Sequence, residues 1–509
     1  MRITMKKIGM RLTAVTLSAV IAMSCTGCSA VTGVLDRFGI EIPGLTGNKT
    51  ESAAAADTAA LGATNTSTEQ ASAEEPAAEP ISPEEERRRS EGKHLNICCW
   101  DESLESLFIM YYPGYEDLGD RTGRIGDVIV NWVIPEDGKY MDMVAEKLLG
   151  AEYLGQDEKI DLYLAPEEDL AVYVNSDYSL DVREKVGLTD EELENQFSYT
   201  QQMASTDDGI LKAVTWQATP GVFVYRRSIA KEVLGTDDPD AVQKFVADWK
   251  TFTSTAAKMK KAKYLMVSGY FDAFSAYRYG ADRHWVNDGS FEIPSVFMEW
   301  KDMMKTFNKK KYHHGTVIGD DRWVADQGPK GKVFGFFRAI TDIDSKMAAY
   351  SLADSDEAPA AGNGVYGDFA VCRGPQPYCR GGVWILAAPG TDNLILDKEI
   401  METLTCNSNL LYKIAQKENI FTNTVTGMKK MASGDMSDPF LGGQNPYEVY
   451  YECAAGLNVL PAGSYDRKMA DSFRDYMLKF FTDKMDEDEA MDSFYQMVDR
   501  EYPELTVDY

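Results

Sequence analysis

The sequence predicts an α/β protein whose parallel strands form a sheet covered by helices. Short apolar runs, each the length of a buried strand, occupy 95–99, 126–133 and 160–164. Segments compatible with helix lie between these runs, at 102–110 and 139–149. The alternation of strand, helix and strand is typical of α/β domains with parallel pairing, because such a connection usually carries a helix across the sheet.

A second set of elements follows further along the chain. Further strands are expected at 221–225, 264–267, 332–337 and 383–388. A helix is expected at 228–234, closed by Gly235, and Asp238 and Pro239 occupy the N-cap and first positions of the next helix. Two C-terminal helices are expected from apolar faces formed by Met469, Phe473, Met477 and Phe480, and by Met491, Phe494 and Val498.

The chain of 509 residues is long enough for two domains, and its formal net charge is −29. A surface of that sign is repelled by phosphate groups, so binding to nucleic acid is a poor hypothesis. Apart from the apolar run near the start, no stretch is apolar for the roughly 20 residues that a membrane span needs.

The first 28 residues have the pattern of a bacterial lipoprotein leader. Four cations precede an apolar run at 12–23, and Thr26 and Gly27 stand directly before Cys28. We therefore expect a signal peptide at 1–27 and a diacylglyceryl group on Cys28. Cys25 occupies a position that usually carries Leu and is itself a possible lipid site. An ordinary secretory signal without lipid is the remaining alternative.

The segment 28–93 is expected to be the lipidated cysteine followed by a disordered tether. Residues 51–83 are nearly all Ala, Thr, Ser, Glu, Asp, Gly and Pro. Such a composition buries too little apolar surface to offset the entropy lost on ordering the chain. The folded body is expected to begin at His94.

No signature of catalysis or of metal binding stands out. The sequence has no GxSxG, no Walker A loop and no HExxH, and its four His are scattered. We therefore expect no catalytic residue, no metal site and no cofactor. Cys98 and Cys99 are neighbours in one strand and point to opposite faces. Cys372 and Cys379 flank a short loop, and a disulfide and two free thiols are equally compatible with the sequence.

Aromatic and polar side chains cluster where predicted strands begin or end. Ligands of open α/β sheets bind beyond the carboxyl ends of strands. Flat aromatic faces pack on sugar rings, while carboxylate, amide and guanidinium groups bond to hydroxyls. We expect the following ligand-binding residues: Trp100, Asp101, Glu102, Trp216, Gln217, Tyr270, Asp272, Trp323, Phe337, Arg338 and Trp384.

Several segments taken in order resemble family 1 extracellular solute-binding proteins, the sugar-binding subunits of ABC importers. They are LNICCWDE at 95–102, IGDVIVNW at 125–132, KIDLYLAPE at 159–167, WQATPGVFVYRRSIAKEVLGTDDP at 216–239, KVFGFF at 332–337, GGVWILAAPGTDN at 381–393 and LGGQNPY at 441–447. The resemblance covers nearly all of the chain from His94 onward.

The resemblance implies a two-lobe, type II periplasmic-binding-protein-like fold with a central ligand cleft. The body, 94–509, would divide into a first lobe at about 94–215 and 387–425 and a second at about 220–381 and 426–509. The chain would cross between the lobes near 216–224 and 382–388.

The function expected from the resemblance is capture of a mono- or oligosaccharide by hinge closure and delivery to an ABC permease. The protein would be a monomer without enzymatic activity, held by lipid at the extracellular face of the cell membrane. A binding protein for a peptide or a polyamine is an alternative, since a polyamine site needs several carboxylates in an aromatic box. An exported carbohydrate hydrolase is a further alternative.

Overall fold

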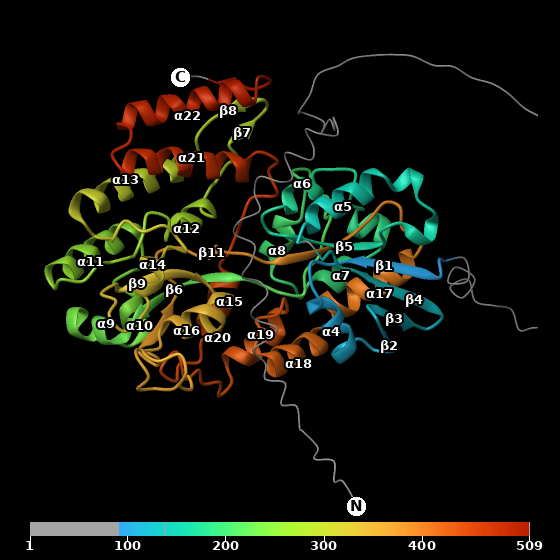
Figure 1. Cartoon of the computed structure of the whole chain (residues 1–509), viewed down its shortest axis with the longest axis horizontal. Coiled ribbons are helices and arrows are strands. Elements are labelled where there is room, and N and C mark those ends of the chain that lie inside the picture. Colours follow the sequence, from blue (N-terminus) through green and yellow to red (C-terminus); the bar gives the residue numbers. More distant parts are fainter. Residues whose placement is uncertain (1–90, 137, 508–509) are drawn as a thin grey trace, which may run out of the picture.

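Two α/β lobes lie side by side in the computed structural model, which describes residues 91–136 and 138–507 (Figure 1). The predicted leader, Cys28 and almost all of the tether lie outside the described residues. Within the described part, no helix combines the length and the apolar character that a membrane crossing requires.

The first lobe is built on a six-stranded sheet with the order β12-β5-β1-β4-β3-β2. Its strands are β1 (His94–Cys98), β2 (Tyr115–Gly119), β3 (Thr122–Ile125), β4 (Val128–Val133), β5 (Leu162–Pro166) and β12 (Val383–Ala387). β1 pairs parallel with β4 and β5, as the sequence pattern predicts, whereas β12 runs antiparallel to β5. The three apolar runs thus form the buried centre of the sheet, with their carboxyl ends at one edge.

The hairpin formed by β2 and β3 was not predicted from the sequence. A single strand was expected at 126–133, whereas β4 begins only at Val128 and is preceded by two antiparallel strands. Asp120 and Arg121 turn the chain between them with φ of 51° and 58°. β2 has the sequence YEDLG and is mostly exposed, so it lacks the alternation of apolar and polar residues that indicates a strand.

Helices cover both faces of the first sheet. In the view of Figure 1, α5 and α6 lie above it and α4 and α18 lie below it. The helices are α4 (Ser103–Tyr111), α5 (Tyr140–Leu149), α6 (Leu170–Val174), α7 (Asp190–Leu193), α8 (Ser198–Met203), α17 (Leu394–Thr405) and α18 (Ser408–Glu418). Short helical turns occur at Ala151–Tyr153, Gln156–Glu158 and Val182–Val186.

The second lobe contains an antiparallel sheet around β6, all of whose residues are buried. Its strands are β6 (Pro220–Arg226), β9 (Gly335–Ala339), β10 (Phe369–Cys372) and β11 (Tyr378–Cys379). The strand expected at 264–267 is wrong: Leu265 makes only an isolated bridge to Val333. The strand expected at 332–337 begins later, at Gly335, because only from there does the chain pair with β6.

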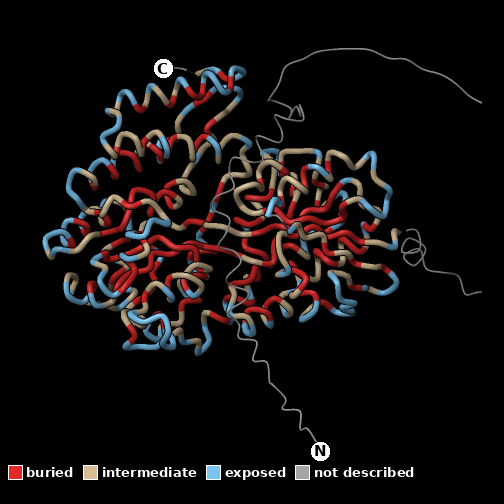
Figure 2. Tube along the Cα trace, in the orientation of Figure 1, coloured by how far each residue is buried: buried red, intermediate tan, exposed pale blue. Residues whose placement is uncertain are grey.

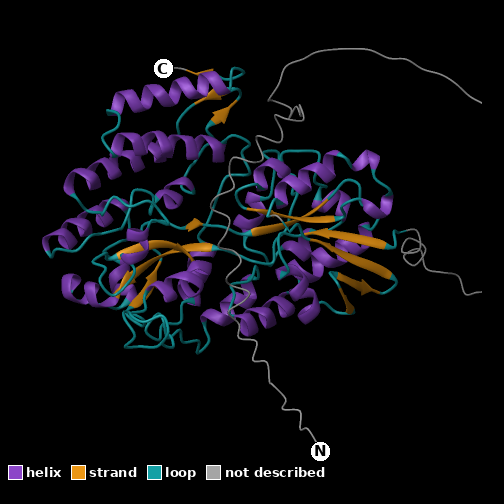
Figure 3. Cartoon of the chain, in the orientation of Figure 1, coloured by secondary structure: helices purple, strands orange, loops and turns teal. Residues whose placement is uncertain are grey.

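The helices of the second lobe pack outside this sheet (Figure 3). They are α9 (Arg227–Leu234), α10 (Pro239–Gln243), α11 (Trp249–Lys261), α12 (Phe274–Arg278), α13 (Ser295–Lys310), α14 (Asp321–Ala325), α15 (Ile340–Asp342), η5 (Ile343–Met347), α16 (Ala348–Tyr350), α21 (Asp466–Phe481) and α22 (Glu487–Glu501). A small sheet joins β7 (Val286–Asn287), β8 (Ser290–Phe291) and β13 (Thr506–Val507).

Two local predictions for these helices have different outcomes. Asp238 is the N-cap of α10 and accepts a hydrogen bond from the backbone N–H of Ala241, which confirms the predicted cap. On α21, Met469, Phe473 and Met477 are buried as predicted, but Phe481 rather than Phe480 completes the buried face. A regular helix turns 100° per residue, and the step from Met477 to Phe481 keeps the side chain on the inner face.

Three extended segments cross between the lobes and pair with one another; we call residues 214–219, 380–385 and 420–424 the crossing ribbon. Val214 pairs with Ile385, and Gln217 pairs with Thr422. The Asn423 side chain accepts from the backbone N–H of Phe197 and donates to Thr200 and to the Thr215 carbonyl. Buried residues run along both sheets and through this ribbon (Figure 2), and one hydrophobic core continues from the first lobe onto one face of the second sheet.

Candidate functional site

Two cavities lie between the lobes. The first has a volume of about 240 Å³ and is lined by the segment after β1, the crossing ribbon, the helical segment after β9 and α20 (Tyr447–Ala455). The second has a volume of about 110 Å³ and is lined by the segment after β5, α12 and the start of α21. Each cavity therefore receives side chains from both lobes.

Aromatic side chains form much of the wall of the first cavity. Trp100 follows β1, and its ring meets the edge of Tyr140 at 5.5 Å between centroids. Phe421 comes from the crossing ribbon and stacks on Tyr447 of α20, with centroids 6.0 Å apart. Tyr450 and Trp216 also line the cavity. The wall thus offers several flat apolar faces of the kind that pack on rings.

Three polar atoms of this wall are buried and have no hydrogen-bond partner in the described part of the chain. They are Oδ2 of Asp101, Nε1 of Trp216 and Oε1 of Gln217. The other carboxylate oxygen of Asp101 accepts from the backbone N–H of Ser103, which fixes the side chain at the start of α4. A buried polar group without a partner costs about 1–3 kcal/mol, so a ligand that bonds to these atoms would recover that free energy.

Two further carboxyl groups face this cavity from the second lobe and the loop before α20. Asp344 lines the cavity and keeps an exposed side chain. Desolvation of its carboxyl group, with Asp438 as a smaller cause, raises the pKa of Asp344 to about 7. Burial likewise raises the pKa of Asp438, although the backbone N–H of Phe440 donates to it.

Four of the eleven predicted ligand residues line the first cavity: Trp100, Asp101, Trp216 and Gln217. Glu102 does not, because its side chain is 68% exposed and faces Arg121 at 3.7 Å. The remaining six lie within the lobes, where they line neither cavity. Among them, Trp384 is 1% exposed and donates to the carbonyl of Thr200 in the first-lobe core.

The other five belong to the interior of the second lobe. Tyr270 stacks on Phe481, and Phe337 packs on Phe223. Trp323 donates to Asp272, whose other oxygen accepts from the backbone N–H groups of Ser268 and Gly269. Arg338 lies over the Trp323 ring at 4.3 Å. We therefore correct their placement: these polar groups hold the segment after Val267 in place instead of facing the cavity.

Most of the cavity wall was not predicted from the sequence. The prediction did not include Asp344, Phe421, Asp438, Tyr447 and Tyr450, because they lie at none of the strand ends on which it was based. The three-residue spacing of Tyr447 and Tyr450 places both on one helical face, and this was the one local signal available.

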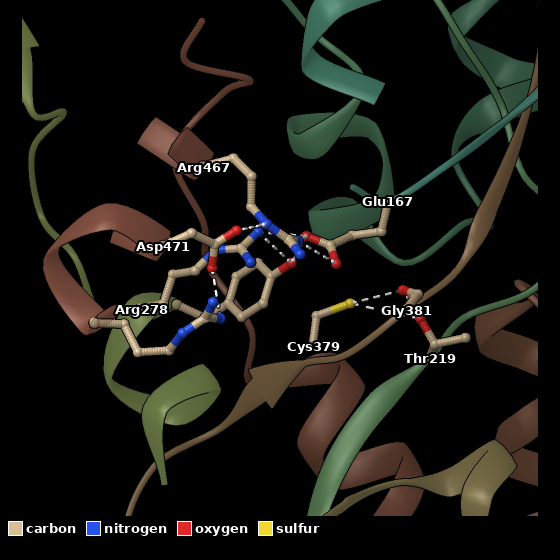
Figure 4. Close-up of polar contacts among 9 residues, drawn as sticks. Glu167, Thr219, Arg278, Cys379, Gly381, Arg467 and Asp471 are labelled. Atoms are coloured by element: carbon tan, nitrogen blue, oxygen red, sulfur yellow. Dashed lines mark hydrogen bonds and ion pairs between the residues drawn. The ribbon is translucent and has the colours of Figure 1, made fainter. Parts of the chain in front are cut away.

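Ion pairs across the lobes dominate the second cavity (Figure 4). Glu167 follows β5, is 7% exposed, and pairs with Arg278 of α12 and with Arg467 of α21, the latter at 3.4 Å. The Tyr279 hydroxyl also donates to Glu167 at 2.6 Å. Burial alone would raise the pKa of Glu167, but the two guanidinium groups outweigh it and hold that pKa at about 2. The first lobe is thus tied to two helices of the second.

The described cysteines are all free. Cys372 lies on β10 and Cys379 on β11, two strands that each pair with β6, and both are buried free thiols. The structure therefore favours two free thiols over a disulfide. Cys98 and Cys99 are likewise free and buried. In the part of the chain that the structure describes, no group of His, Cys, Asp and Glu has an arrangement that could hold a metal ion.

Comparison with solved structures supports the two-lobe fold. An extracellular solute-binding protein of family 1 superposes with a TM-score of 0.65 at 14% identity, covering 81% of this chain and 100% of that one. The sugar-binding protein MalE of Xanthomonas citri gives 0.60 at 12% identity, with 81% and 97% covered. The galacto-N-biose/lacto-N-biose I-binding protein of Bifidobacterium longum gives 0.55 at 14% identity, with 82% and 98% covered.

The sequence itself matches a protein family over half of its length. No protein with a curated description matches the chain. The family described as bacterial extracellular solute-binding protein matches residues 136–393, which run from the end of the first-lobe hairpin strands through the second crossing. The predicted two-lobe α/β fold and the predicted family are both confirmed, and the chain belongs to the family of bacterial extracellular solute-binding proteins.

Proposed function

We propose that this protein captures a carbohydrate in the first cavity and delivers it to an ABC permease, without catalysing a reaction. One observation carries the proposal: three unpartnered buried polar atoms line an aromatic cavity between the lobes. Trp216 supplies a donor, and Asp101 and Gln217 supply acceptors. Sugar hydroxyls both donate and accept, so one polyhydroxylated ring can satisfy all three.

The solved relatives support the choice of a sugar. The Bifidobacterium longum protein is in complex with lacto-N-biose, and a binding protein from B. animalis subsp. lactis with 16% identity and a TM-score of 0.54 is in complex with β-1,6-galactobiose. The aromatic wall adds a physical reason, because the C–H face of a sugar packs on flat rings. A peptide would need partners for its backbone and termini, and a hydrolase would release products that chromatography detects.

We propose that the lobes close over the solute by bending at the crossing ribbon. Gly381 and Gly382 of the second crossing have φ of 75° and 125°, values that favour glycine, and glycine can absorb large backbone changes. Gly221 has another role: a Cβ there would lie 2.0 Å from the Tyr378 ring, so this glycine permits close packing. The pairs between Glu167 and the two arginines would hold the closed form.

The domain division and the anchor are part of the same proposal. The first lobe would comprise about 94–215 and the chain from β12 to about 425, and the second lobe the rest of the body. Residues 1–27 would be removed as a signal peptide, Cys28 would carry lipid, and 29–93 would space a monomeric body from the extracellular face of the membrane. The leader pattern and the composition of 51–83 support this arrangement.

Replacing Trp216 by Phe should weaken sugar binding by at least about 1 kcal/mol, because the variant loses the indole donor while it keeps an aromatic ring. Isothermal titration calorimetry with a sugar that binds the wild-type protein measures the change in affinity. Trp300→Phe is the matched control: Trp300 is also a buried indole without a partner, but it lies in the second-lobe core. Equal affinities of the Trp216 variant and the wild type would contradict the proposal that the sugar binds in the first cavity.

Cys28→Ser should release the protein from membranes into the medium, because the serine hydroxyl cannot take the place of the thiol that receives the lipid. Cell fractionation followed by immunoblotting gives the distribution. Cys25→Ser is the matched control and should leave the protein on the membrane. Release by Cys25→Ser alone would assign the lipid to Cys25.

Glu167→Gln should lower the free energy of unfolding by about 3 kcal/mol near neutral pH, because Arg278 loses its carboxylate partner and Arg467 keeps only Asp471. The folded-state pKa of about 2 lies below the usual value of 4.5, so the stabilisation is complete above about pH 4.5. It is then lost as the pH falls toward 2. Urea unfolding of both proteins across that range measures the difference.

The control for this change is Glu102→Gln, which removes an exposed carboxylate 3.7 Å from Arg121 and should cost less than about 1 kcal/mol. If the Glu167 pairs also hold the lobes together, small-angle scattering should give Glu167→Gln a larger radius of gyration than the wild type in the absence of solute. Equal stability of the Glu167 variant and the wild type would show that the pairs do not tie the lobes.

A further inference from the structure

The charges that line the first cavity are all of one sign. Asp101, Asp344 and Asp438 line it, and no Lys, Arg or His does among the described residues. The three carboxyl groups come from three separate segments: the turn after β1, the turn η5 that follows β9 and α15, and the loop before α20. They are therefore brought together by the fold and are not a run of neighbours in the sequence.

None of the three carboxyl groups has a cationic partner in the described part of the chain. Asp101 and Asp438 accept from backbone N–H groups of Ser103 and Phe440. Asp344 receives only a long contact from the Asn419 amide, at 3.4 Å. These neutral donors leave the negative charge of the cavity uncompensated.

The second cavity is organised in the opposite way, although it lies between the same lobes. Glu167, Glu168 and Asp466 line it together with Arg278, Arg283 and Arg467. Its acids and bases therefore balance within the protein itself. The contrast shows that unbalanced charge is a property of the first cavity and not of the whole acidic surface.

A separate observation indicates that the first cavity binds a polar solute. Trp216 is 4% exposed, lines the cavity, and has an indole Nε1 without a hydrogen-bond partner in the described part of the chain. Aromatic faces of Trp100, Tyr447 and Tyr450 stand around the same space. Aromatic faces together with carboxylates are the surroundings that a desolvated ammonium group prefers.

We propose that the solute held in the first cavity carries an amino group, protonated when bound and placed near Asp344 and Asp438, so that the carbohydrate is an amine-bearing sugar. This inference rests on the proposed function and specifies its substrate class. The raised pKa values of Asp344 and Asp438 agree with it, because carboxyl groups that are hard to ionise alone gain most from a bound cation.

The test compares matched sugars by isothermal titration calorimetry with the full chain near pH 7, where a bound ammonium group can hold the Asp344 carboxyl in its ionised form. The pairs are glucosamine and glucose, galactosamine and galactose, and the β-1,4-linked glucosamine dimer and cellobiose. Amino groups replace hydroxyls within each pair, one in each monosaccharide and two in the dimer. At least one amine should bind ten times or more tighter than its neutral partner, and the advantage should shrink at high salt because ions screen the attraction.

Two variants locate the charge. Asp344→Asn and Asp438→Asn should each reduce the affinity ratio of the amine to its neutral partner by threefold or more. Asp488→Asn, on the exposed start of α22, should leave the ratio unchanged. Thermal unfolding of each variant verifies that it folds. A ratio that stays the same in both folded cavity variants would overturn the placement of the amine.

The remaining outcomes separate this inference from the function on which it rests. If neutral sugars bind as tightly as the amines, the inference on charge is overturned and carbohydrate capture stands. If spermidine binds and no sugar does, the charge is supported and the carbohydrate class is overturned. If neither spermidine nor any sugar of the panel binds, both proposals are overturned.

Discussion

The pairing of three chain crossings is the constraint on which the rest of the structure depends. Val214 bridges to Ile385 and Gln217 to Thr422, so the first crossing pairs with both of the others. Each crossing also continues into an element of a lobe, as at β6 and β12. The ribbon therefore sets how the lobes face each other, and it brings Trp216 and Gln217 beside Phe421, more than two hundred residues away.

The two cavities between the lobes differ in whether their buried polar groups have partners within the protein. Around Glu167, the cost of burying a carboxylate is offset by two guanidinium groups and a hydroxyl, so that cavity is closed by the protein's own groups. Around the first cavity, Asp101, Trp216 and Gln217 each keep a buried polar atom without a partner in the described part of the chain. Unpaired buried polar groups lower the stability of a protein. Binding of a ligand that bonds to these groups is the physical reason for keeping them in the first cavity.

Local patterns in the sequence predicted the elements with strong apolar runs. β1, β5, β6 and β12 were found because they are buried and continuous, whereas the exposed β2 lacked a signal. For the site, the rule that ligands lie beyond strand ends correctly directed attention to Trp100 and Asp101. It could not separate a side chain that faces a cavity from one such as Trp384 that turns into the core. Nor could it supply Tyr447, whose place depends on tertiary packing.

The most direct test of the account is a crystal structure of the protein with a sugar that calorimetry shows to bind. The account predicts that the sugar fills the first cavity, accepts a hydrogen bond from Trp216 Nε1, donates to Gln217 Oε1, and is enclosed by both lobes. A sugar bound instead in the second cavity, with Glu167 separated from Arg278 and Arg467, would contradict it.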